Sequence, residues 1–63
     1  MAQIQIGNRF RKIGDRWMVW QVVGTVKDEE GVPHYLIADT NDRTNVKTIS
    51  AIALADTARY EPV

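Results

Sequence analysis

Hydrophobic and polar residues alternate along most of this chain, and alternation with a period of two is the pattern of half-buried β-strands. The longest such segment covers residues 17–27, where β-branched and aromatic residues occupy nearly every position except Gly24. So many apolar positions indicate a strand that is buried partly on both faces. We predict one long strand over 17–27 that bends at Gly24 and so serves two parts of a small β-barrel.

Four further segments have strand-like patterns and are separated by turn-forming residues. Phe10 is the inward residue of the first, and Pro33, which has no backbone N–H, indicates a sheet edge or a strand start in the third. In the fourth, Lys47 shares a face with Asn45. The expected strands cover residues 4–6 continued by 9–13, then 17–27, 32–39, 44–49 and 59–61.

Polar residues mark tight turns between these strands. Residues 28–31 form an expected hairpin turn in which Gly31 is placed for a positive φ, and residues 40–43 form a second turn. Five short strands with turns about every 8–12 residues are the order of an SH3-like barrel. We therefore predict an all-β fold, a small five-stranded SH3-like barrel with one short helical turn before the last strand, as a single domain over residues 1–63.

The helical turn is expected directly after the fourth strand. Ser50 can cap a turn over residues 51–54, in which Ile52 and Leu54 would close one end of the barrel. The alanine content of residues 50–58 also allows a longer helix of two turns there.

Size and composition exclude several ways of stabilising this chain. It has 63 residues and no cysteine, so disulfides and thiolate-bound metals are excluded, and the lone His34 cannot form a structural zinc site. No apolar run approaches the ~20 residues of a membrane span, and no signal-peptide pattern is present. We expect a cytoplasmic protein without a membrane partner, stabilised by its apolar core, by a homo-oligomer or by both.

The net charge is zero, but the charges are unevenly distributed. Residues 1–27 carry five basic side chains against one acidic, and residues 28–42 carry five acidic and no basic ones. Arg9 and Arg11 are expected on one outward face of the first strand. These arginines either pair with the acidic segment or, beside an exposed aromatic ring, offer a surface suited to nucleic acid or an acidic partner.

Trp17 and Trp20 are three residues apart and therefore point to opposite faces of an extended strand. The face of Trp20 is the more apolar one, since it carries Met18, Val22 and Val26, and we predict Trp20 inside. Trp17 is the candidate for an exposed contact, and the alternative is that it covers a barrel end.

No group of residues indicates catalysis. No serine, cysteine or carboxylate lies at a signature spacing from His34, and the carboxylates of residues 28–30 cannot all converge on one ion. The glycines form no phosphate-binding motif. We expect neither an enzyme nor a cofactor nor a metal site.

The segment Ile4-Gln5-Ile6-Gly7-Asn8-Arg9-Phe10-Arg11-Lys12 resembles the opening of many SH3-like barrels. It is similar to that of the plasmid-encoded type II dihydrofolate reductases, single SH3-like barrels of comparable length that line a shared pore in a tetramer. The stretch that corresponds to their pore reads Val46-Lys47-Thr48-Ile49 here and lacks their ligand-contacting glutamine and tyrosine. This resemblance implies the barrel and not the activity.

A second resemblance covers most of the chain. The segments Gly-Asn-Arg-Phe-Arg, Val-Trp-Gln-Val-Val, Val-Pro-His and Thr-Ile-Ser are similar to those of a group of short bacterial proteins. This resemblance implies a freestanding small domain and supplies no function.

We expect a binding or adaptor module that recognises a protein partner through an aromatic and basic face. The alternative is a weak binder of single- or double-stranded nucleic acid through the same strands. A third hypothesis, an enzyme with a composite pore, depends on fold analogy alone. The residues expected to bind are Arg9, Arg11, Lys12, Arg16 and Trp17.

Overall fold

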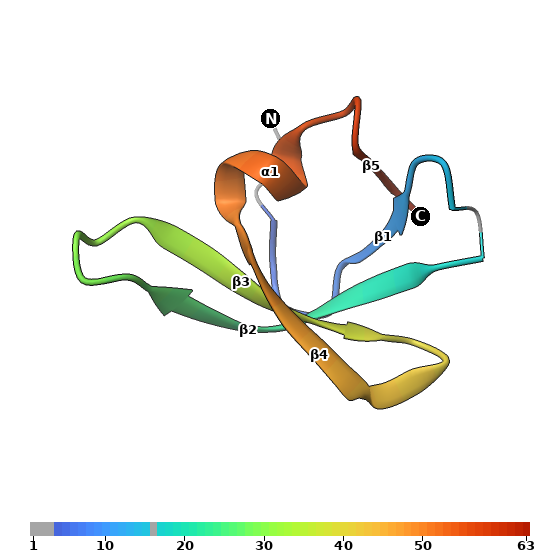
Figure 1. Cartoon of the computed structure of the whole chain (residues 1–63), viewed down its shortest axis with the longest axis horizontal. Coiled ribbons are helices and arrows are strands. Elements are labelled where there is room, and N and C mark those ends of the chain that lie inside the picture. The colour runs from blue at the N-terminus through green and yellow to red at the C-terminus, as the bar shows by residue number, and fades with distance from the viewer. Residues whose placement is uncertain (1–3, 16) are drawn as a thin grey trace.

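The computed structural model describes residues 4–15 and 17–63, which form one antiparallel sheet and a short helix (Figure 1). Five strands in the order β4-β3-β2-β1-β5 make up the sheet. The predicted five strands, with one short helix before the last of them, are confirmed. The elements are β1 (Arg9–Lys12), β2 (Val19–Lys27), β3 (Pro33–Asp39), β4 (Asp42–Ser50), α1 (Ala51–Ala55) and β5 (Tyr60–Pro62).

The sheet is bent rather than flat, and β4 and β5 are its two edges (Figure 1). No backbone ladder joins these two strands within the described part of the chain, so the sheet is not closed. Closure into an SH3-like barrel therefore stays a prediction.

A β-bulge bends the central strand β2 where the sequence predicts a bend. Val22 is paired with Ile37 of β3, and Gly24 is paired with the next residue, Leu36, which leaves Val23 as the extra residue. A Cβ atom at Gly24 would lie 3.2 Å from Cδ1 of Leu36. The missing side chain thus leaves room for Leu36 beside the bulge.

The extra residue also reverses the alternation of the faces along β2. Trp20 and Val22 are buried, as expected, but Val26 is paired with His34 on the opposite face and is 40% exposed. The prediction that Val26 shares the inward face of Trp20 is therefore wrong. A bulge shifts every later side chain of its strand to the other face, and strict alternation cannot anticipate it.

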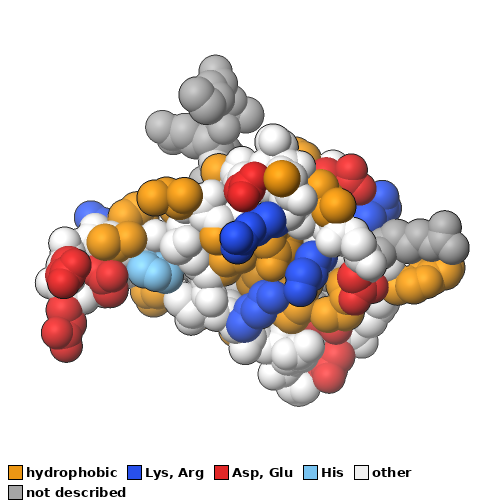
Figure 2. Space-filling view, turned by 45° about the horizontal axis from the view of Figure 1, so that its top comes forward, with side chains coloured by type: hydrophobic (Ala, Val, Ile, Leu, Met, Phe, Trp, Pro, Cys, Tyr) orange, Lys and Arg blue, Asp and Glu red, His pale blue; other side chains and the backbone are white. Residues whose placement is uncertain are grey.

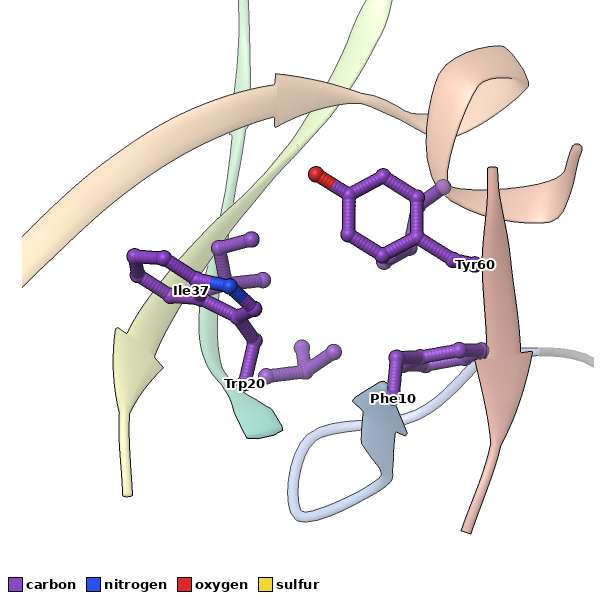
Figure 3. Packing of buried hydrophobic residues seen from close by; sticks show 6 residues of the cluster. Phe10, Trp20, Ile37 and Tyr60 are labelled. Carbon is purple, nitrogen blue, oxygen red and sulfur yellow. The ribbon is translucent and has the colours of Figure 1, made fainter. Parts of the chain in front are cut away.

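The core lies on the concave side of the sheet, where side chains from different strands meet (Figure 3). Phe10 of β1, Trp20 of β2, Ile37 of β3 and Tyr60 of β5 converge there. Burying one large apolar side chain stabilises the folded state by about 1.5–3 kcal/mol. Because the cluster is small, the stability of the fold depends on a few such side chains. Its buried members are Phe10, Trp20, Val22, Ile37, Leu54 and Tyr60.

Helix α1 follows β4 without a loop and covers one side of the core. Ser50 is its N-cap, as predicted, and the Ser50 hydroxyl accepts a hydrogen bond of 3.1 Å from the backbone N–H of Ala53. The helix ends at Ala55, so the alternative of two turns over residues 50–58 is wrong. Asp56 follows it, and its carboxylate accepts from the backbone N–H of Ala58 in the next turn.

Only one of the two apolar side chains expected to close the barrel end does so. Leu54 is 1% exposed, whereas Ile52 is 81% exposed. The prediction for Ile52 is wrong because residues two apart on a helix do not share a face.

The segment before β1 is a turn and not the expected short strand over residues 4–6. The backbone N–H of Gln5 donates to Oδ1 of Asn8 over 2.8 Å, and Gly7 has a φ of 98°. Ile6 is 65% exposed as a result. Gly7 N–H nevertheless donates to the carbonyl of Val22, which attaches this turn to β2.

The two apolar residues of α1 provide a matched test of this packing. We expect Leu54→Ala to lower the free energy of unfolding by about 3 kcal/mol, because it leaves a cavity in the core. Ile52→Ala should change it by no more than about 0.5 kcal/mol. Urea denaturation followed by circular dichroism measures both values, and equal losses would contradict the placement of Leu54.

Candidate functional site

The two arginines of β1 lie on the convex face of the sheet. Residues paired directly across antiparallel strands have their side chains on the same face of the sheet. One row of such paired residues begins at Arg9 and runs across β1, β2, β3 and β4. It lies on the face opposite to Trp20, and Arg11 follows on the same face because it is two residues after Arg9. This is the arrangement that the alternation predicts. The row consists of Arg9, Gln21, Ala38 and Val46.

A third arginine is held over this face by Gln21. Nη1 of Arg43 in β4 donates to Oε1 of Gln21, and Nε2 of Gln21 donates over 3.3 Å to the carbonyl of Gly7. Gln21 therefore fixes Arg43 on the side of the sheet that carries Arg9. We call the surface formed by Arg9, Arg11, Gln21 and Arg43 the arginine face.

One arginine of this face has an acidic partner. Nη1 of Arg11 lies 3.4 Å from Oε1 of Glu61, which is paired with it in β5, and the two side chains are 38% and 51% exposed. Such an exposed pair contributes little to stability, about 0–1 kcal/mol. Arg9 and Arg43 have no carboxylate at ion-pair distance in the described part of the chain.

The acidic segment of residues 28–42 does not neutralise the arginines. Oδ1 of Asp28 accepts from the backbone N–H groups of Glu30 and Val32, so this carboxylate holds its own hairpin turn, and Gly31 has the expected positive φ of 81°. The turn forms the left end of the molecule in Figure 1, and acidic side chains gather there in Figure 2. The alternative in which this segment pairs with the basic strand is therefore wrong for the ion pairs that the structure describes.

The other predicted binding residues do not extend the arginine face. Lys12 is paired with Tyr60, which places it on the opposite face from Arg11. Trp17 is 76% exposed, but β2 begins only at Val19, so Trp17 belongs to the connection between β1 and β2. Arg16 lies outside the described residues. Alternation along β1 is the physical reason why Lys12 cannot join Arg9 and Arg11.

Lys47 has contacts that the sequence interpretation did not identify. Its Nζ atom lies 4.4 Å from the centroid of the Trp20 ring and donates to the hydroxyl of Tyr60 over 3.4 Å. Lys47 belongs to β4 and Tyr60 to β5, so one side chain connects the two edges of the open sheet. The signal was present, because Lys47 shares its predicted face with the apolar Ile49.

Basic side chains gather over apolar ones in the middle of the face shown in Figure 2. Two buried side-chain nitrogens have no hydrogen-bond partner among the described residues, namely Nε of Arg11 and Nε1 of Trp20. The cation–π contact therefore holds an indole whose own N–H makes no hydrogen bond.

A cavity of about 580 Å³ lies between the N-terminal turn, α1 and β5. Its size is within the range of small-molecule pockets, about 300–1,000 Å³. No histidine or carboxylate side chain is among the residues that line it in the described structure. Its apolar lining consists mainly of Ile4, Phe10, Leu54, Tyr60, Pro62 and Val63.

No group of three His, Cys, Asp or Glu side chains within residues 4–15 and 17–63 could hold a metal ion. His34 lies on the convex face, and its Nδ1 is 2.9 Å from the carbonyl of Val32. Across the same ranges, no helix is long and apolar enough to cross a membrane.

Comparison of the chain with protein-family models, with curated proteins and with solved structures found no match. The two resemblances drawn from the sequence therefore stay predictions. Any functional conclusion has to come from the surfaces described above.

Asp42, the first residue of β4, has a carboxylate with a shifted pKa. The hydroxyl and the backbone N–H of Thr44 donate to Oδ1 of Asp42 over 2.6 and 3.1 Å, and these bonds lower the pKa of Asp42 below its usual value. A lowered pKa in the folded state stabilises the fold above the pKa of the unfolded chain, and this stabilisation is lost as the pH falls through the lowered value.

We expect Thr44→Val to raise the pKa of Asp42 toward its usual value, because the hydroxyl donor is the largest cause of the shift. A carboxyl-carbon NMR titration measures this pKa directly. Thr48→Val, the same substitution farther along β4, is the control and should leave the pKa of Asp42 unchanged. An unaltered titration in Thr44→Val would contradict the assignment.

The contacts of Lys47 also lead to a stability prediction. We expect Lys47→Ala to lower the free energy of unfolding by about 1 kcal/mol, because it removes a half-buried cation–π contact. Lys27→Ala changes an exposed lysine at the end of β2 and should have no measurable effect. Urea denaturation of the two variants tests this difference, and similar losses would show that the contact contributes nothing.

Proposed function

We propose that this chain is a binding module that recognises a protein partner through the arginine face. One observation carries the proposal: three arginines from two different strands share an exposed sheet face, and among the described residues only Arg11 of these three has a carboxylate partner. Arginine presents several donors in a fixed planar arrangement, which suits carboxylate groups of a partner.

The surroundings of the arginines support a protein partner in particular. Val46 lies in the same row as Arg9 and is 48% exposed, and Val19 is paired with Arg11 on the same face and is half-buried. Apolar side chains beside arginines are typical of protein interfaces, in which arginine is enriched. The expected partner segment therefore combines acidic and apolar side chains.

Nucleic acid fits this face less well. Recognition of single strands depends on aromatic rings that stack on bases, and the rows of paired residues containing Arg9 and Arg11 include no Trp, Tyr or Phe. The net charge of the chain is zero, whereas nucleic-acid binders are commonly basic.

The proposal is tested by selecting peptides from a random displayed library against the wild-type chain. We expect enriched peptides to contain Asp or Glu together with apolar residues. The double variant Arg9→Glu/Arg43→Glu should weaken their binding about tenfold or more, because it reverses two charges of the face. Amide NMR shifts in β1, β2 and β4 should locate the peptide on the arginine face.

The matched control is Lys12→Glu/Lys27→Glu, which changes the net charge equally at positions outside the arginine face. It should bind the selected peptides nearly as well as the wild type. If both double variants lost the same affinity for the peptides, net charge alone would explain the loss, and the proposal would be contradicted. A short single-stranded oligonucleotide that binds the same amides more tightly than any peptide would favour the nucleic-acid alternative instead.

A further inference from the structure

The cavity between the N-terminal turn, α1 and β5 has a floor made of core residues. Phe10, Leu54 and Tyr60 line it, and all three are buried members of the hydrophobic cluster. Two of these three side chains are aromatic rings, one from β1 and one from β5. The cavity therefore offers an entering group contacts with the core itself.

The rim of the same cavity is exposed to solvent. It is formed by the N-terminal turn, the end of α1 and the segment around β5, which lie near one another in Figure 1. An apolar side chain of another molecule can therefore reach the floor from outside. The exposed residues of this rim include Asn8, Ala55, Thr57, Pro62 and Val63.

Arg9 connects the cavity with the arginine face. It is exposed, it lines the cavity, and it is the one charged residue among the described residues that do so. Arg9 and Phe10 are successive residues of β1 and face opposite sides of the sheet, yet both line the cavity. The cavity thus extends around the start of β1, from the core to the border of the arginine face.

The lining indicates the chemistry of a group that would fit. A mainly apolar lining favours an uncharged apolar group, and the rings of Phe10 and Tyr60 favour an aromatic one, since aromatic pairs are attractive beyond their buried area. The guanidinium of Arg9 suits a carboxylate. The volume of about 580 Å³ is enough for a drug-sized ligand, so an aromatic side chain and the backbone beside it fit.

We propose that the partner segment inserts an aromatic side chain into this cavity and binds Arg9 through an acidic residue close to it in sequence. Successive residues of an extended segment are only about 3.3 Å apart, so the aromatic and the acidic residue are neighbours or are separated by one position. Aromatic side chains seated in pockets are typical anchors of protein interfaces. This proposal rests on the binding proposed for the arginine face and specifies the segment that binds.

Filling the cavity tests the anchor with peptides selected against the wild-type chain. We expect the enriched peptides to carry Phe, Tyr or Trp within two positions of Asp or Glu. Ala55→Phe places a large side chain at the rim and should weaken their binding about tenfold or more. Ala58→Phe is the matched control, because Ala58 is also exposed and does not line the cavity. Amide NMR spectra show whether each variant is folded.

A minimal probe tests the cavity without any selected peptide. The acetylated dipeptide amides Asp-Phe and Phe-Asp are titrated to about 10 mM, since so few contacting atoms give dissociation constants in the millimolar range. We expect amide NMR shifts at Leu54, Tyr60 and Val63 in the wild type and none in Ala55→Phe. Replacing Phe by Ala in the dipeptides should abolish these shifts, and replacing Asp by Asn should weaken binding.

Two arginine variants separate this proposal from the one on which it rests. Arg9→Gln should weaken the dipeptides about threefold or more, because it removes the cation at the cavity. Arg43→Gln should leave them unchanged, because Arg43 belongs to the arginine face and does not line the cavity.

Two outcomes would overturn the proposal. In the first, peptides bind through the arginine face, but Ala55→Phe binds them as well as the wild type does and the dipeptides shift no amide at the cavity. The binding module would then stand without the aromatic anchor. In the second, no peptide is enriched while the dipeptides still shift the cavity amides, which would assign the cavity to a small aromatic acid instead of a partner segment.

Discussion

The burial of Trp20 is the contact on which the rest of this structure depends. Trp20 is the second residue of β2, and its indole lies in one cluster with Phe10, Ile37 and Tyr60 from three other strands (Figure 3). Among the described residues of this 63-residue chain, no second hydrophobic cluster of this size could compensate for its loss. The concave side of the sheet is therefore committed to the core, and binding surfaces have to form on the convex side or along the edges.

The bulge in β2 determines how the two faces are used. Before it, Trp20 and Val22 point into the core and Gln21 points outward beside Arg9; after it, Val26 points outward. The bulge thus lets one strand serve two differently oriented parts of the sheet without exposing Trp20.

The open sheet has a polar connection where a closed one would have a backbone ladder. Lys47 extends from β4 over Trp20 to the hydroxyl of Tyr60 in β5. A charge that points toward the core from an edge strand is one of the ways in which proteins limit strand pairing.

The sequence by itself determined the number and order of the strands, the cap at Ser50, the turn at Gly31 and the choice of Trp20 over Trp17 for the core. These features depend on local alternation and on turn chemistry, which neighbouring residues express directly. Only the tertiary structure decided which face Val26 occupies, because the bulge before it arises from the pairing of β2 with β3. The exposure of Ile52 and the separation of Lys12 from Arg9 and Arg11 follow from local helix and strand periodicity.

The same limit applies to the candidate site. The bond from Arg43 to Gln21 and the contact of Lys47 with Trp20 join residues that are more than twenty positions apart. Their geometry depends on strand register and on a bulge, and neither can be read from local periodicity. The sequence therefore determined which strands form, and the packing of those strands around Trp20 decided which charged side chains share a surface.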